Sequence, residues 1–169
     1  IYIVNSHGPN SLFKNQGDVK FQDIGVETNS DDTKAWGNGG CAADFDNDGY
    51  RDLYVSNYGD SKLLRNSGNT GFQDITYQSG MGEKDPSYRA MGCAWGDYDR
   101  DGLLDLIVVR YFHEWKPGIL DALDFKDAIR PLALYHNLGE ARFENVTNLL
   151  GALTLPKGFR NGRHPWSVL

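Results

Sequence analysis

Two short acidic segments of the chain are candidates for binding metal ions. The first starts at Asp44 and reads DFDNDGYRDLYV, and the second starts at Asp97 and reads DYDRDGLLDLIV. Each has aspartates at positions 1, 3, 5 and 9 and a glycine at position 6. Four carboxylates this close together repel one another unless a cation lies between them. The spacing therefore predicts two divalent-cation sites.

The ligand chemistry favours Ca²⁺ at both sites. Hard oxygen ligands without His or Cys suit Ca²⁺ better than zinc or copper. The glycine allows a sharp turn, after which position 7 can offer its backbone carbonyl. The predicted ligands are Asp44, Asp46, Asp48, the Tyr50 carbonyl and Asp52 in the first segment, and Asp97, Asp99, Asp101, the Leu103 carbonyl and Asp105 in the second.

Two alternative interpretations of the acidic segments are weaker. An EF-hand needs a glutamate at position 12, but that position is Val55 in one copy and Val108 in the other. The bulky and β-branched residues around these valines also predict a strand where an EF-hand has a helix. A solvated acidic turn would explain one copy, but two copies in register argue for a metal site.

A second repeated element alternates with the acidic segments. LFKNQGDVKFQDIG starts at Leu12, LLRNSGNTGFQDIT at Leu63 and LYHNLGEARFENVT at Leu134. In each copy, a tight turn separates two short strand-like runs, which predicts a hairpin. A unit of about 50 residues with several short strands is typical of a propeller blade, and a solenoid is the second choice. We therefore expect an all-β fold of about three four-stranded antiparallel blades.

We expect residues 1–169 to form one partial propeller domain, in which successive blades hold the acidic segments in place. We expect residues 1–35 to end one blade and residues 161–169 to start another. Residues 36–88 should form the blade with the first motif, and residues 89–160 the blade with the second. Since propellers close with about four to eight blades, we expect further blades or other protein chains to complete the assembly.

The second blade is expected to contain an insertion at 112–131. Its apolar spacing over 119–129 predicts a short helix, although a recognition loop that presents His113, Glu114 and Trp115 is an alternative. His7, His136 and His164 have no catalytic motif partner, and no nucleophile motif is present. We therefore expect a non-catalytic protein. The alternative is the propeller of a calcium-dependent carbohydrate-active enzyme, a lyase or a hydrolase.

Composition restricts the partners. The formal net charge is −6, and the two motifs contain eight of the 23 acidic residues. Because the basic residues are scattered, nucleic acid is not an expected partner. No apolar run is long enough for a membrane span. Carbohydrate is a further candidate partner.

The two cysteines precede the two acidic motifs. Cys41 lies three residues before Asp44, and Cys93 lies four residues before Asp97. On extended strands, this one-residue offset directs the two side chains to opposite faces. We therefore expect two small buried residues, with a mutual disulfide as the alternative.

The acidic motifs and the N-x-G elements together resemble the FG-GAP/VCBS repeats, which are related to the head of the integrin α subunit. The nearest variety looks like that of bacterial ASPIC/UnbV-type secreted proteins. The resemblance implies a seven-bladed propeller in which each calcium loop ties strands together at the blade edge. It also implies the ligand roles given above. We expect an extracellular or periplasmic protein that serves as a structural, adhesion or assembly module, because millimolar external calcium would saturate weak sites.

Overall fold

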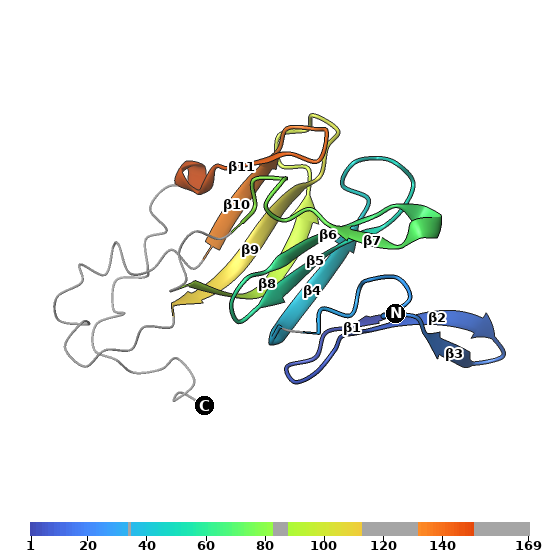
Figure 1. Ribbon diagram of the computed structural model, residues 1–169. Coiled ribbons are helices and arrows are strands. Elements are labelled where there is room, and N and C mark those ends of the chain that lie inside the picture. The colour runs from blue at the N-terminus through green and yellow to red at the C-terminus, as the bar shows by residue number, and fades with distance from the viewer. Residues whose placement is uncertain (34, 83–87, 113–131, 151–169) are drawn as a thin grey trace, which may run out of the picture.

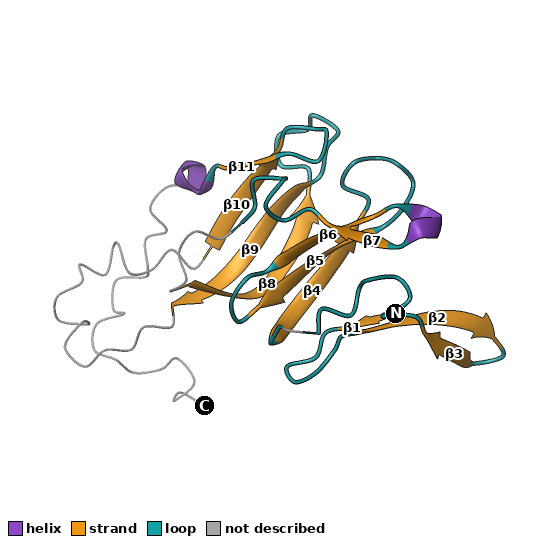
Figure 2. Ribbon diagram, viewed as in Figure 1, coloured by secondary structure: helices purple, strands orange, loops and turns teal. Residues whose placement is uncertain are grey.

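Short runs of residues between turns fold into antiparallel sheets (Figure 1), and the central strands Asp52–Asn57 and Asp105–Phe112 are rich in β-branched and aromatic residues. The computed structural model describes residues 1–33, 35–82, 88–112 and 132–150. These residues form one sheet of three strands and two sheets of four (Figure 2). The prediction of an all-β fold made of partial propeller blades is confirmed.

Each sheet is a meander, in which neighbouring strands follow one another in sequence. The first sheet contains β1 (Tyr2–Ile3), β2 (Ser11–Gly17) and β3 (Lys20–Asp23). The second contains β4 (Gly37–Ala43), β5 (Asp52–Asn57), β6 (Lys62–Asn66) and β7 (Phe72–Asp74). The third contains β8 (Tyr88–Gly96), β9 (Asp105–Phe112), β10 (Leu132–Asn137) and β11 (Phe143–Asn145). Single 3₁₀ turns lie at Gly68–Thr70 (η1) and Thr147–Leu150 (η2).

The two acidic motifs connect equivalent strands of successive sheets. The first joins β4 to β5, where Ala43 pairs with Asp52, and the second joins β8 to β9, where Gly96 pairs with Asp105. A β-bulge also recurs at the same point of β4 and β8. The sequence repeat is therefore a structural repeat, and it places the two loops at corresponding ends of their sheets.

The main core lies where the second and third sheets face each other. One of its members is Phe45, which is fully buried although it belongs to the first acidic motif. The Phe45 ring stacks on Trp95 of β8 with the ring centroids 5.7 Å apart, and it meets Phe143 of β11 edge-on. Burying one such side chain stabilises the fold by about 1.5–3 kcal/mol. The first loop is thus anchored in the neighbouring sheet.

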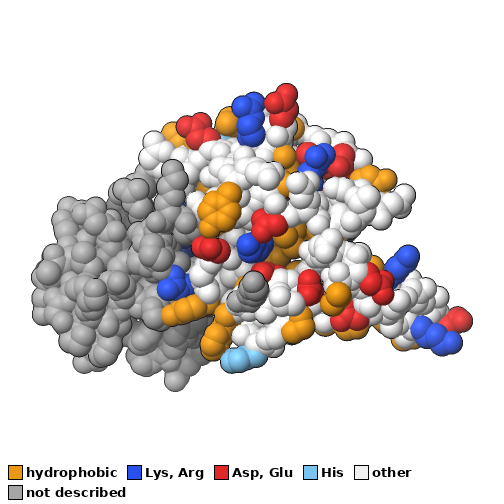
Figure 3. Space-filling view, viewed as in Figure 1, with side chains coloured by type: hydrophobic (Ala, Val, Ile, Leu, Met, Phe, Trp, Pro, Cys, Tyr) orange, Lys and Arg blue, Asp and Glu red, His pale blue; other side chains and the backbone are white. Residues whose placement is uncertain are grey.

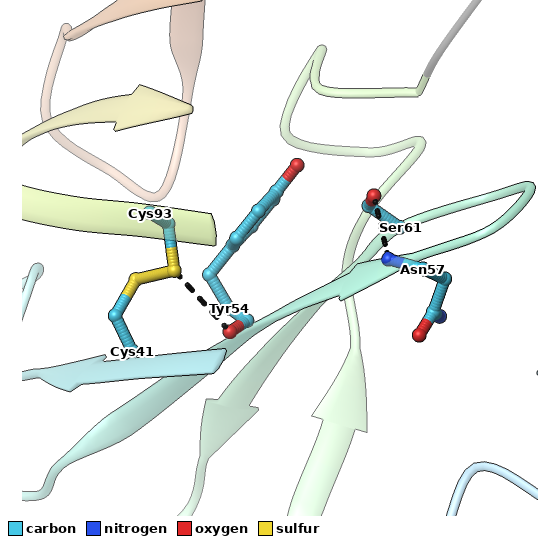
Figure 4. Close-up of a disulfide and its surroundings, with 5 residues drawn as sticks. All are labelled: Cys41, Tyr54, Asn57, Ser61 and Cys93. Carbon is cyan, nitrogen blue, oxygen red and sulfur yellow. Dashed lines mark hydrogen bonds between the residues drawn. A yellow bond between two sulfur atoms is a disulfide. The ribbon is translucent and has the colours of Figure 1, made fainter. Parts of the chain in front are cut away.

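Cys41 and Cys93 form a disulfide between these two sheets, so the expectation of two unpaired cysteines is wrong. Figure 4 shows the bridge between β4 and β8, with the Cys93 Sγ atom 3.9 Å from the Tyr54 carbonyl oxygen. The offset does direct the two side chains to opposite faces. In the strand register, Cys41 lies opposite position 11 of the motif that follows it, whereas Cys93 lies opposite position 12 of its motif. However, the cysteines belong to different sheets, and opposite faces are the ones that meet when two sheets stack. The Cα atoms are 5.9 Å apart.

Several predictions made from the sequence lie outside the described residues. These are the helix at 119–129, the loop residues His113, Glu114 and Trp115, and the start of a further blade at 161–169. Within the described ranges, no helix has the length and apolarity that a membrane crossing requires. On the face shown in Figure 3, acidic and basic side chains are mixed over the second and third sheets.

Candidate metal centres

Both acidic loops adopt the same backbone conformation. Position 4 lies in the left-handed region in each, with φ of 58° at Asn47 and 66° at Arg100. The glycine at position 6 has φ of 90° at Gly49 and 91° at Gly102. A side chain at position 6 would be strained at this φ, which explains why the motif has glycine there.

Backbone N–H groups hold the aspartates of each loop in place. At position 1, Asp44 accepts hydrogen bonds from the amides of Asp48 and Gly49, at 3.0 and 2.9 Å. Its counterpart Asp97 accepts the equivalent bonds from Asp101 and Gly102, both at 3.1 Å. The backbone of each loop is therefore folded around the carboxylate at position 1.

The carbonyls predicted as ligands belong to residues that also position a carboxylate. The Tyr50 amide donates to Asp48 Oδ1 at 2.9 Å, and the Leu103 amide donates to Asp101 Oδ1 at 2.8 Å. The residue at motif position 7 is therefore held next to the carboxylate at motif position 5 in both loops. The ligand role of the two carbonyls stays a prediction.

The aspartate at position 9 is buried in both loops. Asp52 accepts hydrogen bonds from the Phe45 amide at 3.1 Å and from the Asn66 amide at 2.8 Å. Burial raises the pKa of Asp52 to about 6, and the charges of Asp46 and Asp48 add to the rise, although the two backbone hydrogen bonds lower it. Keeping this carboxylate ionised at neutral pH costs folding free energy, and a nearby cation would offset that cost.

Asp46 has a carboxylate oxygen that is buried and without a hydrogen-bond partner. Its side chain is only 7% exposed. One oxygen, Oδ2, contacts Arg65 Nε at 2.5 Å, but the buried Oδ1 has no hydrogen-bond partner. A buried, unpartnered carboxylate oxygen is costly unless something binds it.

The second loop has a histidine beside it. His136 Nδ1 lies 3.0 Å from Oδ1 of the buried Asp105 and 3.6 Å from Asp99 Oδ2. No catalytic motif in the sequence includes His136, but the structure places the two carboxylates of Asp99 and Asp105 beside it. A T-shaped contact with the Tyr98 ring, with the centroids 5.8 Å apart, also holds the imidazole.

The predicted ligands gather in both loops, but not as complete sets. Ligand atoms lie within 4.8 Å of one another in three groups: Asp44, Asp46 and Asp48; Asp97, Asp99 and Asp105; and Asp99, Asp101 and His136. Asp52 lies outside the first group, and it is held through its backbone hydrogen bonds. These clusters could hold a metal ion.

The asparagine of the N-x-G element is a structural residue that the sequence analysis did not identify. Asn66 donates from its side chain to the Arg51 carbonyl at 3.0 Å and accepts from the Gly68 amide at 2.9 Å. Asn137 makes the equivalent bonds, to Leu104 at 3.0 Å and from Gly139 at 3.0 Å. The recurrence of the asparagine in all three copies was the available signal.

Asn137 also connects the two loops. Its Nδ2 donates to the carbonyl of Phe45 at 2.9 Å, and its backbone amide donates to Asp105 Oδ1 at 2.9 Å. On the exposed side, Asn47 Nδ2 donates directly to the Gly102 carbonyl at 3.3 Å. The two candidate centres therefore share a hydrogen-bond network.

A separate cavity of about 510 Å³ lies beside the β5–β6 turn. Its lining includes Asp31, Asp32, Asp60, Asp74 and Lys62. Three of these carboxylates are already engaged, since Lys62 pairs with Asp74, Tyr77 donates to Asp60 and Asn57 donates to Asp32. The cavity therefore does not resemble the two loops, in which carboxylates face one another.

Known proteins contain similar sequences. The FG-GAP-like repeat matches the chain twice, over residues 1–55 and 44–108. Cartilage acidic protein 1 of Xenopus tropicalis is 39% identical over 82 residues, which are 46% of this chain and 13% of that protein. The human cartilage acidic protein 1 is 37% identical over 79 residues, 44% of this chain and 12% of that protein. The matched part thus spans about one eighth of the length of these relatives.

Proposed function

The chain belongs to the FG-GAP-like repeat family, and we propose that it is an extracellular calcium-binding repeat module whose two acidic loops each bind one Ca²⁺. The ion acts structurally, because it binds the folded loop and hardly binds the unfolded chain. We propose no catalytic role. The module serves adhesion or assembly, and its partners are further blades or other protein chains, with carbohydrate as a second class.

The unpartnered Oδ1 of Asp46 is the observation that carries this proposal. It lies in a cluster of aspartates whose other oxygens accept hydrogen bonds from the loop backbone or from the Arg65 guanidinium. The raised pKa of Asp52 is consistent with this proposal, because burial, and to a smaller extent the charges of Asp46 and Asp48, disfavour its ionised form, which a nearby cation would stabilise. The residues present therefore fit a hard dication with oxygen ligands.

The inter-sheet disulfide supports an extracellular setting. Disulfides form and persist in oxidising compartments, and cytosolic thiols are kept reduced. Calcium is also abundant outside cells, where sites with dissociation constants of about 10⁻⁴–10⁻³ M are common. Both features are consistent with function at a cell surface or in a matrix, and a periplasm would meet the same redox condition.

Removal of calcium should destabilise the protein reversibly. At a calcium concentration 100 times the dissociation constant, each site adds about 2.7 kcal/mol to the free energy of unfolding. We expect EDTA to lower the melting temperature by several degrees and excess CaCl₂ to restore it, as measured by circular dichroism. Calorimetric titration should find two ions per chain.

Variants at position 3 of each loop test the assignment. Asp46→Asn and Asp99→Asn should each reduce the calcium stoichiometry from two to one. Asp18→Asn is the matched control, because Asp18 is exposed in the β2–β3 turn, and it should leave both ions in place. Two bound ions in either loop variant, or a melting temperature indifferent to EDTA, would disprove the proposal.

A further inference from the structure

The residue before the N-x-G asparagine differs between the two loops. It is Arg65 in β6 and His136 in β10, and the two occupy the same position of the structural repeat. Both side chains reach the carboxylates of their own loop. A single repeat position thus places a different nitrogen group in each candidate centre.

Arg65 lies against two predicted ligands of the first loop. Its Nε is 2.5 Å from Asp46 Oδ2, and its Nη2 is 3.4 Å from Asp48 Oδ2. A guanidinium is always charged and has no lone pair to offer a metal. It can only compensate the carboxylates in place of an ion, so a dication must displace it or tolerate its repulsion.

His136 has a different chemistry in the second loop. A neutral imidazole nitrogen is a metal ligand. One of its ring nitrogens lies within 4.8 Å of ligand oxygens of Asp99 and Asp101, and Nδ1 lies 3.0 Å from Oδ1 of the buried Asp105. In the tautomer protonated at Nε2, Nδ1 has a free lone pair next to the loop carboxylates and can ligate an ion. A mixed set of one imidazole and several carboxylates suits a borderline ion such as Zn²⁺ as well as Ca²⁺.

We propose that this one repeat position sets the metal preference of each loop. Arg65 competes with the ion and weakens calcium binding in the first loop. His136 adds a nitrogen ligand, so the second loop also takes a borderline transition ion. The inference rests on the proposed function, since it assumes that both loops bind a dication.

A reciprocal exchange tests the proposal at constant pH 7.5. The wild-type protein and the variants Arg65→His and His136→Arg are titrated calorimetrically with CaCl₂ and, separately, with ZnCl₂. We expect one zinc ion per wild-type chain, two for Arg65→His and none for His136→Arg. His136→Gln should weaken zinc binding about tenfold or more while changing calcium affinity far less.

Arg65→Met isolates the competition. It should raise the calcium affinity of the first loop about five- to tenfold, because one repelling charge is gone. The same variant should lower the melting temperature without calcium and increase the gain on adding it. Lys62→Met is the matched control, because Lys62 lies on the same strand but pairs with Asp74 at 2.8 Å, outside the loop. It should lower both melting temperatures equally.

The outcomes separate this inference from the function on which it rests. If calcium binds with a stoichiometry of two but the Arg65 and His136 variants leave calcium and zinc affinities unchanged, the inference fails and the proposed function stands. If the wild-type chain binds no calcium, both fail. Zinc bound equally well by His136→Gln and wild type would exclude the nitrogen ligand.

Discussion

Replacement of Cys41 and Cys93 by serine is expected to lower the free energy of unfolding by about 4 kcal/mol. The bridge joins residues separated by 52 positions, so it removes a large amount of loop entropy from the unfolded chain. It also fixes β4 against β8, where the second and third sheets share their core. The measurement is urea unfolding at saturating calcium.

A reducing agent provides the matched comparison. Wild-type protein in reductant should unfold at the same urea concentration as the double serine variant, and the variant should not respond to reductant. Equal midpoints for oxidised wild type and variant would mean that the bridge contributes no stability. A similar loss in calcium-free protein is expected, because neither cysteine touches a loop carboxylate.

The second large effect is expected at the N-x-G asparagines. Asn137→Ala should lower the free energy of unfolding by about 3 kcal/mol or more, since it leaves the carbonyls of Phe45 and Leu104 without their donor. Asn137 is 1% exposed, so water cannot easily replace the amide. The substitution removes the buried one of the two side-chain hydrogen bonds that connect the loops.

The repeat supplies its own controls. Asn66→Ala should cost about half as much, because Asn66 is partly exposed and bonds only within its own repeat. Asn15→Ala should cost less than about 1 kcal/mol, since exposed Asn15 makes a single bond, from Gly17 at 2.9 Å. Equal losses of unfolding free energy at all three positions, measured by thermal unfolding, would show that the hydrogen bond to Phe45 adds no stability of its own.

The fold was predictable because it repeats. The recurrence of the acidic motif and of the N-x-G element fixed the period, and the strand-like runs between them fixed the all-β class. The two loops could also be located, since their aspartates lie within nine consecutive residues. Local spacing therefore carried most of the information about the candidate centres.

Relations between sheets were not predictable in the same way. The cysteine offset was interpreted as evidence against a disulfide, but two stacked sheets bring opposite faces together. His136 lies 31 residues from Asp105 in sequence, so no local motif joins them. Aligning the N-x-G copies would have shown that Lys14, Arg65 and His136 share one position of the repeat. This shared position indicates a role for His136 beside the acidic loop and not in catalysis.

Phe45 belongs to the first loop by sequence and to the next sheet by packing. The free energy of ordering that loop is therefore shared with its neighbour, as in a one-dimensional array with nearest-neighbour coupling. The two sheets should then melt as one cooperative unit, although each contains its own motif. An insertion that shifted one blade relative to the next would disturb a candidate metal centre without altering any of its carboxylates.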